Sequence, residues 1–545
     1  MQLLKFIEKE TTESYRQVLL IAIISGLANG LLLVIINHVT EAVAKNEDLT
    51  QYFILYMIAF TLFLYAQWYA FERAIKIIEN AIYNTKTRLI GKIQKVELVF
   101  IEKIGANTLY GRLTQNDTLV SQAIPRIVAG FQVFTLMVFS FIYLGYLSPL
   151  SFIITMMFLA VGVMYFLAHS RFIQKSLQQV KQKEKIYFLS ISHLINGFKE
   201  IKVNQNKGKD LLNHIAKVSS EAQSIKTAVR KPEARLWGFG RLFIYALFPI
   251  VIFIIIPNFS HEHIVNIAKI SSTLLFLIGP TSILVSTIPM ISRVNIAIED
   301  LFSLEKEMDA TITQADDTKT EMAEMTNLAD FKTISLDNMS FSYPDSGSDS
   351  DDAFSVGVFN EQIHKGELLF IVGNNGSGKS TFLKLLTGLY SPTKGNLSVD
   401  KLLIDAPHSV AYRNLFSLIF TDFHLFDRFY GIPNLNEEKV NYWLEKMQMQ
   451  HKVSYQNGGL TSTNLSTGQR KRLAFIVAML EDKLILVLDE FAADQDPQFR
   501  QYFYETLLGE VKAMGKTIIA VTHDEHYFHV ADRVLQMDAG KIKQG

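Results

Sequence analysis

GNNGSGKST, from Gly373 to Thr381, directly follows the apolar run Leu368–Val372. The glycines let backbone N–H groups turn inward around phosphate oxygens, while Lys379 reaches the β- and γ-phosphates and Ser380 offers a hydroxyl to Mg²⁺. A helix that begins there directs its positive end at the same phosphates. Strand, loop and helix stand in the order that predicts an ATP-binding α/β domain. The expected nucleotide contacts of the loop are Gly373, Asn374, Asn375, Gly376, Ser377, Gly378, Lys379, Ser380 and Thr381.

A second apolar run, LILVLDE, extends from Leu484 to Glu490. Its apolar residues predict a buried strand, with Asp489 at the end where it can hold Mg²⁺ through water. Glu490 can then polarise the attacking water as general base. Beside a phosphate-binding loop, these two carboxylates predict ATP hydrolysis, with Ser380 and Asp489 as metal ligands.

A third stretch, LSTGQRKR from Leu465 to Arg472, resembles the signature LSGGQ of the ABC-transporter ATPases. Serine and glycine at a helix start form a second anion-binding terminus. The resemblance implies that this segment contacts the γ-phosphate held by a partner subunit's loop, so that two ATP molecules lie between two ATPase domains. Thr467 stands where the family usually has glycine. The implied contacts are Ser466, Thr467, Gly468 and Gln469.

The resemblance extends to four further positions. Tyr343 in FSYP is similar to the aromatic residue that stacks on adenine. His523 in VTHD resembles the switch histidine that touches the γ-phosphate and, with Lys379 and Glu490, completes the expected catalytic set. Asp496 resembles the aspartate that links the two sites of the dimer. Thr421 replaces the glutamine that in most ABC exporters contacts Mg²⁺, and its shorter side chain reaches the metal only through a water.

The sequence around Thr421 and the short segment from there to Ser466 resemble the corresponding segments of half-transporters that export cyclic peptides and peptide siderophores from bacteria. That branch implies a homodimer that moves a peptide-like cargo by alternating access. Lipid flippases share the same architecture, and a regulator without cargo is a third reading; the intact Glu490 and His523 argue against the regulator. The resemblance is specific in the ATPase domain and loose in the membrane domain, where cargo is chosen.

Composition separates the chain of 545 residues into two halves. Hydrophobic residues make up 49% and charged residues 19%, but the long apolar runs all lie in the first three hundred residues. The net charge of zero gives no reason to expect nucleic acid as a partner. Without cysteine, disulfides and thiol chemistry are excluded.

Six runs are close to the roughly 20 residues that cross a bilayer as a helix. They are Tyr15–Val39, Tyr52–Phe71, Val128–Leu147, Pro149–Ser170, Trp237–Pro257 and Val265–Ile291. The segments between the second and third and between the fourth and fifth runs are strongly basic. The positive-inside rule therefore places these segments, both termini and the ATPase domain in the cytoplasm, as expected for a multi-pass protein of the bacterial inner membrane.

These patterns predict an all-α transmembrane domain of six helices over residues 1–304, a polar linker over 305–333 and an α/β nucleotide-binding domain over 334–545. The cytoplasmic segments read as helices that continue beyond the bilayer and turn back near Phe100–Leu113 and Ile195–Asn204. Short strands are expected at Ile334–Leu336, Glu367–Val372, Leu484–Leu488 and Thr517–Val521. Asn29, Gln67, Arg241 and Lys269 lie in or near the spans and are candidates for cargo contact or for helix–helix bonding.

Overall fold

The long apolar stretches form helices, because a helix satisfies its own backbone hydrogen bonds over any length. The computed structural model describes residues 2–250, 253, 264–312, 328, 330–343, 355–404, 409–432, 435–456, 458–462 and 464–543, without some helical side chains, chiefly those of 165–185 and 239–244. The chain divides into two units, which are residues 1–91 with 107–307, and residues 92–106 with 308–545.

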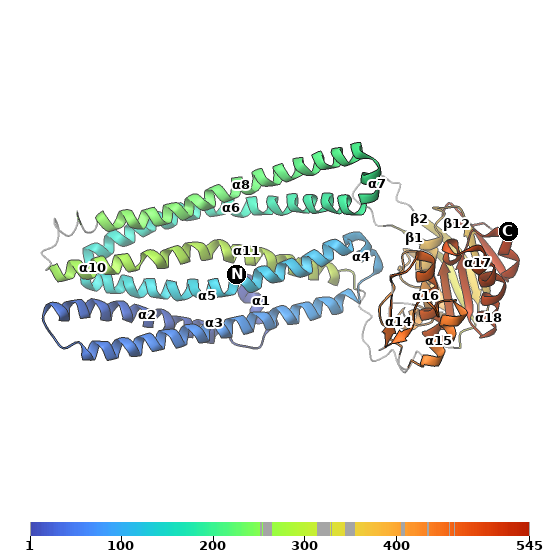
Figure 1. Cartoon of the computed structure of the whole chain (residues 1–545), viewed down its shortest axis with the longest axis horizontal. Coiled ribbons are helices and arrows are strands. Elements are labelled where there is room, and N and C mark those ends of the chain that lie inside the picture. The colour runs from blue at the N-terminus through green and yellow to red at the C-terminus, as the bar shows by residue number, and fades with distance from the viewer. Residues whose placement is uncertain are drawn as a thin grey trace. The chain divides into compact units, whose positions relative to one another are not determined.

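The first unit is helical, and its long helices lie side by side (Figure 1). Helices α6 and α8 run antiparallel and are joined through the short helix α7, as expected for a segment that extends and turns back. The helices of this unit are α1 (Gln2–Glu10), α2 (Tyr15–Ala44), α3 (Thr50–Ile93), α5 (Ala106–Leu147), α6 (Pro149–Asn196), α7 (Phe198–Val203), α8 (Gln205–Pro249), α10 (Ile264–Phe276) and α11 (Ile278–Asp309).

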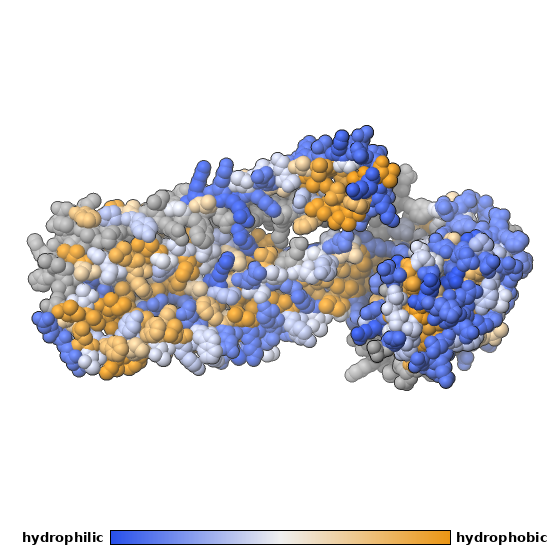
Figure 2. Space-filling model, in the orientation of Figure 1, coloured by the Kyte–Doolittle hydropathy of each residue, from blue (hydrophilic) through white to orange (hydrophobic). Residues whose placement is uncertain are grey.

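The surface of the helical unit is apolar over much of its area. Figure 2 shows orange hydrophobic atoms spread along the helices, whereas the α/β unit is mostly blue. On α3, Phe53, Ile58 and Trp68 are each more than 60% exposed. Four helices in the described residues are long and apolar enough to cross a bilayer: Tyr15–Val43, Thr50–Ile93, Ala106–Leu147 and Ile267–Asp309. Exposure of so much apolar surface is unfavourable in water and favourable in the hydrocarbon core of a bilayer.

Four of the six expected spans coincide with these helices. The expected spans 149–170 and 237–257 fall largely in α6 and α8, where many side chains are not described, and residues 251–252 and 254–257 lie outside the described residues. The number of six therefore stays a prediction. The turn between α5 and α6 is tight, since α5 ends at Leu147 and α6 begins at Pro149.

Ionisable side chains in the helical unit pair with one another. Lys269 is buried, and its Nζ donates to Glu41 of α2. Close by, the buried amide of Asn37 donates to the hydroxyl of Thr273 at 3.3 Å. These contacts favour a helix–helix role for Lys269 over a contact with cargo. Arg241 lies outside the side chains that the structure describes, and Asn29 and Gln67 are half-buried.

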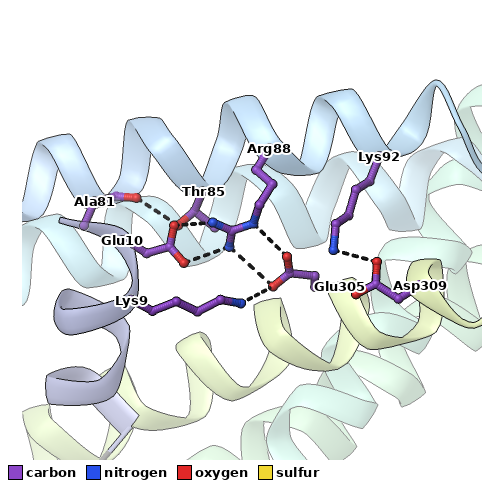
Figure 3. A network of polar contacts seen from close by, with 8 residues as sticks. All are labelled: Lys9, Glu10, Ala81, Thr85, Arg88, Lys92, Glu305 and Asp309. Carbon is purple, nitrogen blue, oxygen red and sulfur yellow. Dashed lines mark hydrogen bonds and ion pairs between the residues drawn. The ribbon is translucent and has the colours of Figure 1, made fainter. Parts of the chain in front are cut away.

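Within the helical unit, Arg88 of α3 joins α1 to α11 (Figure 3). Its NH2 donates to Glu10 Oε1 at 2.8 Å, and its Nε donates to Glu305 Oε1 at 2.7 Å. The Glu10 side chain is only 1% exposed and that of Glu305 is 8% exposed. Lys9 adds a second cation on Glu305, 3.0 Å from its Oε2.

The second unit is an α/β domain built on two sheets. Five parallel strands and one antiparallel edge strand form the sheet β12-β11-β3-β10-β9-β6, and β2-β1-β4-β5 form an antiparallel sheet beside it. The strands are β1 (Thr333–Ser342), β2 (Ser355–His364), β3 (Leu368–Gly373), β4 (Lys394–Val399), β5 (Leu402–Leu403), β6 (Phe416–Ile419), β7 (Tyr455–Gln456), β8 (Gly459–Leu460), β9 (Ile485–Asp489), β10 (Thr517–Val521), β11 (Arg533–Asp538) and β12 (Lys541–Ile542).

Helices cover the six-stranded sheet. One short helix from far upstream in the sequence, α4, belongs to the same unit. The helices are α4 (Leu98–Ile104), α13 (Lys379–Leu386), α14 (Ser409–Arg413), α15 (Glu437–Lys446), α16 (Thr467–Leu480), α17 (Pro497–Tyr502) and α18 (Leu508–Ala513), with shorter turns η2 (Phe491–Asp494), η3 (Phe503–Leu507) and η4 (Glu525–Val530). The central strands β3, β9 and β10 are buried almost throughout. Such continuous apolar runs are typical of parallel strands covered on both faces.

All four expected strands are present, as parts of β1, β3, β9 and β10. A helical N-terminal region followed by an α/β nucleotide-binding fold is confirmed. In the segment expected as a linker, α11 continues to Asp309, and residues 313–327 lie outside the described residues. The acidic loop Asp345–Ala353 and the outer loop around His261 also lie outside them.

Candidate nucleotide-binding site

The phosphate-binding loop connects β3 to α13. All three of its glycines have positive φ, +150° at Gly373, +79° at Gly376 and +94° at Gly378. A Cβ at Gly373 would lie 2.2 Å from the carbonyl oxygen of Met537, and one at Gly378 would lie 2.8 Å from the side chain of Val356. Only glycine fits both conformation and space, so the loop can bend tightly between strand and helix.

Lys379 closes the inside of this loop. It is buried, and its Nζ donates to the carbonyl oxygens of Gly373 at 2.9 Å and Asn374 at 3.0 Å. Burial lowers the pKa of Lys379, while the nearby carboxylates of Glu490 and Asp489 act in the opposite direction. An anion bound at the loop would supply the negative charge that the neutral carbonyl partners of the Lys379 ammonium lack.

The loop fits a polyphosphate. Asn374, Asn375 and Gly376 are exposed, whereas the Ser377 hydroxyl is buried and has no hydrogen-bond partner in the described residues. A buried hydroxyl without a partner is costly unless a ligand satisfies it. The N-terminus of α13 begins at Lys379 and adds backbone N–H groups directed at the same place.

The end of β9 brings a carboxylate to the loop. The Ser380 hydroxyl donates to Asp489 Oδ2 at 2.9 Å, and Asp489 is 1% exposed. Burial raises the pKa of Asp489, although the hydrogen bond from Ser380 lowers it. A carboxylate beside a hydroxyl is a donor set that suits Mg²⁺. Thr421 lies exposed in the turn after β6, and no hydrogen bond joins it to either residue in the part of the chain described.

Glu490 follows with an unusual backbone. Its φ is +50°, a left-handed conformation that few residues other than glycine adopt. Two contacts hold it there: its N–H donates to Val521 of β10 at 3.1 Å, and its carbonyl accepts from Lys471 Nζ at 2.6 Å. The Glu490 Oε1 then lies 3.2 Å from Nε2 of His523. Strain of this kind is typical of a functional position.

Tyr343 stands directly after β1, on the side of the loop. Its hydroxyl shares a hydrogen bond of 3.0 Å with Thr381 Oγ1, and its ring meets Phe341 edge-on at 5.1 Å. The structure brings Ser380 to Asp489, Glu490 to His523, and Tyr343 to Thr381 of the phosphate-binding loop. The roles that the sequence predicts for these residues stay predictions.

The signature segment lies apart from this group. Ser466 caps α16, where its Oγ accepts from the Gln469 N–H at 3.4 Å while Gln469 Oε1 accepts from the Ser466 N–H at 3.3 Å. In the described residues no hydrogen bond or ion pair joins Ser466, Thr467, Gly468 or Gln469 to the phosphate-binding loop. The helix start is thus exposed and available to a ligand held elsewhere.

Sequence reasoning did not find the residues that tie this helix to the end of β9. Lys471 forms an ion pair of 2.7 Å with Asp494, and Arg472 donates to Gln495 at 2.8 Å and to Asp496 at 2.6 Å. Asp496 also caps α17, and the N–H of Phe499 and the Arg472 guanidinium lower its pKa. The adjacent Lys471 and Arg472 in LSTGQRKR were the signal that the sequence offered for these contacts, because cations that become buried on folding require partners.

The comparisons agree with this geometry. A family model described as ABC transporter matches residues 357–493, which include β3, the phosphate-binding loop and β9. The chain is 31% identical to the ATP-binding protein SyrD of Pseudomonas syringae pv. syringae over 544 residues, which cover 96% of this chain and 93% of the relative. It is 33% identical over 205 residues to the ATP-dependent lipid A-core flippase of Neisseria meningitidis serogroup B, covering 35% of this chain and 33% of that protein.

A site of this kind on this fold defines an ATP-hydrolysing nucleotide-binding domain. With a relative aligned along nearly the whole chain, the protein belongs to the ABC transporter family. It is a membrane-embedded half-exporter that carries its apolar helices and its ATPase domain in one polypeptide, and it couples ATP hydrolysis to transport.

Proposed function

We propose that this protein exports a peptide-like cargo, such as a cyclic or modified peptide or a siderophore, by alternating access as a homodimer. The carrying observation is the pair formed by Glu490 and His523, 3.2 Å apart beside Ser380 and Asp489. An intact base and metal-binding pair support hydrolysis rather than a regulatory role. The proposed site of action is the bacterial inner membrane, with both termini and the ATPase domain in the cytoplasm.

Each residue has a distinct part in the proposed hydrolysis. Lys379 binds the β- and γ-phosphate oxygens and Tyr343 stacks on adenine. Ser380 and Asp489 would hold Mg²⁺, with Thr421 contributing through a water, and the metal would supply charge neutralisation at the phosphates. Glu490 orients the attacking water and accepts its proton, and His523 holds the Glu490 carboxylate and contacts the γ-phosphate.

The exposed start of α16 supports the homodimer. A single chain has one phosphate-binding loop and one signature segment, and among the described residues no hydrogen bond or ion pair joins the two. Ser466 and Gly468 of one protomer would bind the nucleotide held by its partner. Because every expected catalytic position is present in this chain, two identical copies suffice for two complete sites.

Substrates are chosen in the helical unit, whereas the evidence for the cargo class comes from the nucleotide-binding domain. The similarity to the lipid A-core flippase covers only about a third of each chain, and its extent is that of an ATPase domain. The relative aligned along 93% of its length is described as an ATP-binding protein. Similarity in the ATPase domain therefore does not favour a lipid as the cargo. The proposal of a peptide-like cargo follows from the resemblance around Thr421.

The test compares cells that carry the intact protein with cells that carry Glu490→Gln. Small molecules inside and outside the cells are profiled by mass spectrometry. The proposal expects a modified or cyclic peptide that intact cells release and mutant cells retain. A shift in lipid sidedness with unchanged peptides would instead identify a flippase, and no change in either would favour a regulator without cargo.

A further inference from the structure

Helix α4, which lies between two membrane-spanning helices in the sequence, belongs to the same structural unit as the nucleotide-binding domain. Its Glu102 carboxylate accepts from Lys384 Nζ at 2.7 Å and from the Tyr390 hydroxyl at 2.5 Å. Lys384 lies on α13, the helix that begins in the phosphate-binding loop. The contact therefore joins α4 to the element that carries the nucleotide site.

Tyr390 is the innermost part of this contact. It is only 1% exposed, and its ring stacks on Phe341 with a centroid distance of 4.7 Å and an interplanar angle of 25°. Burial and the adjacent Glu102 carboxylate raise the pKa of Tyr390, so its hydroxyl remains a hydrogen-bond donor at neutral pH. A buried donor with one charged acceptor has a single favourable orientation.

The same ring reaches the expected adenine-stacking residue. Tyr390 meets Tyr343 edge-on, with centroids 6.0 Å apart and planes at 90°. Tyr343 in turn packs edge-on against Phe341 and bonds to Thr381 of the phosphate-binding loop. Three aromatic rings thus form one cluster, with Glu102 at one end and Thr381 at the other.

We propose that Tyr390 is a positioning residue that couples α4 to nucleotide binding by fixing the ring of Tyr343. The inference rests on the proposed role of Tyr343 in stacking on adenine and goes beyond it. Because the buried ring of Tyr390 packs against the half-buried ring of Tyr343, a shift of Glu102 displaces Tyr390, and Tyr390 displaces Tyr343. Movement of the membrane helices would thereby alter nucleotide affinity, and bound nucleotide would stabilise one position of α4.

A second contact of α4 provides a matched control. The Ser391 hydroxyl donates to Glu97 at 2.8 Å, one residue further along the chain from Tyr390. This bond also joins the α4 region to the nucleotide-binding fold. Ser391 has no ring in the aromatic cluster, so its loss tests docking of α4 without disturbing Tyr343.

The test uses purified full-length protein and four variants: Tyr390→Phe, Tyr390→Leu, Ser391→Ala and Tyr343→Ala. Equilibrium binding of trinitrophenyl-ATP is measured by fluorescence, and the ATPase reaction gives KM and kcat. We expect Tyr390→Leu to raise Kd and KM about threefold to tenfold with kcat nearly unchanged, since side chains in contact are energetically coupled. Tyr390→Phe, which keeps the ring, restores most of the affinity, and Ser391→Ala binds like the intact protein.

The decisive comparison repeats Tyr390→Leu in the Tyr343→Ala background, with melting temperatures confirming that each variant is folded. We expect no further loss of affinity there, because Tyr390 acts through Tyr343. An equal loss in both backgrounds, or a fall in kcat alone, would overturn the positioning role while leaving the proposed exporter intact. If Tyr343→Ala binds nucleotide normally, the positioning role and the proposed stacking role both fail, whereas loss of ATP binding in Lys379→Ala would still support the ATPase assignment.

Discussion

The imidazole Nε2 of His523 lies 3.2 Å from Oε1 of Glu490, although 33 residues separate the two in sequence. The parallel pairing of β9 with β10 produces this contact, because Asp489 is in register with Val521 and both strands end at the same edge. Glu490 directly follows the end of β9, and His523 lies two residues after Val521, the last residue of β10. Hydrolysis is therefore predicted to depend on a pair that the sheet holds in place.

Glu490→Gln should lower the ATPase rate about a hundredfold or more, since the amide cannot accept the proton of the attacking water. Nucleotide binding should change little, because Lys379 and the loop are untouched. ATP turnover and binding of trinitrophenyl-ATP measure the two effects. Glu505→Gln, at an exposed carboxylate that accepts from Gln501, is the control. Equal turnover in both variants would remove Glu490 from the mechanism.

Asp489→Asn should abolish hydrolysis yet raise the melting temperature of the nucleotide-free protein near neutral pH. The pKa of Asp489 is raised in the folded state, chiefly by burial, so its charged form destabilises the fold above that pKa. The cost disappears as the pH falls and the carboxylate becomes protonated, and the asparagine never carries it. The gain should thus shrink as the pH falls from neutral toward the raised pKa of Asp489. A gain that grows on acidification would contradict the sign of this shift.

Two inactive variants should complement each other in a mixed dimer. Lys379→Ala damages the loop and Ser466→Arg damages the signature segment, so each homodimer has no complete site. A mixed dimer keeps one intact loop facing one intact signature segment. Trapping of labelled nucleotide with vanadate should recover to about half the intact level in purified mixed dimers, which have one complete site of two. Recovery in either homodimer, or none in the mixture, would count against sites shared between protomers.

Arg88→Met should strongly destabilise the helical unit, because it leaves the buried carboxylates of Glu10 and Glu305 without the guanidinium between them (Figure 3). Removal of one partner from a buried pair costs about 3–5 kcal/mol. Lys92→Met, which loses an ion pair to the half-exposed Asp309, should cost no more than about 1 kcal/mol. Melting temperatures in detergent compare the two.

Adding Glu10→Gln and Glu305→Gln to Arg88→Met should recover part of the loss, because neutral amides tolerate burial better than unpaired carboxylates. If the triple variant is less stable than Arg88→Met alone, the destabilisation does not arise from stranded charge.

Local patterns predicted the site because its chemistry is written in short segments. The loop at Gly373 is marked by its glycines, and the strand that ends at Asp489 is marked by a continuous apolar run. The helix at Ser466 is marked by the serine at its start. The Arg88 network could not be predicted in this way, since Glu305 lies 217 residues from Arg88 and neither position shows a periodic pattern. Tyr390 and Glu102 were missed for the same reason, with 288 residues between them.

The backbone of Glu490 was also beyond sequence reasoning. An apolar strand that ends in Asp-Glu indicates two carboxylates, but not the left-handed conformation that turns the second toward His523. That conformation depends on Lys471, which reaches the Glu490 carbonyl from α16. Tertiary contacts here impose a conformation that local preference disfavours.

ATP-driven export is tested most directly with purified protein in inside-out proteoliposomes. The peptide-like compound retained by Glu490→Gln cells is added outside the vesicles with Mg²⁺ and ATP, and its accumulation inside is followed by mass spectrometry. The account predicts accumulation against a gradient with the intact protein and none with Glu490→Gln or without ATP. Equal accumulation with intact and Glu490→Gln protein, or ATP hydrolysis that moves lipid and no peptide, would contradict it.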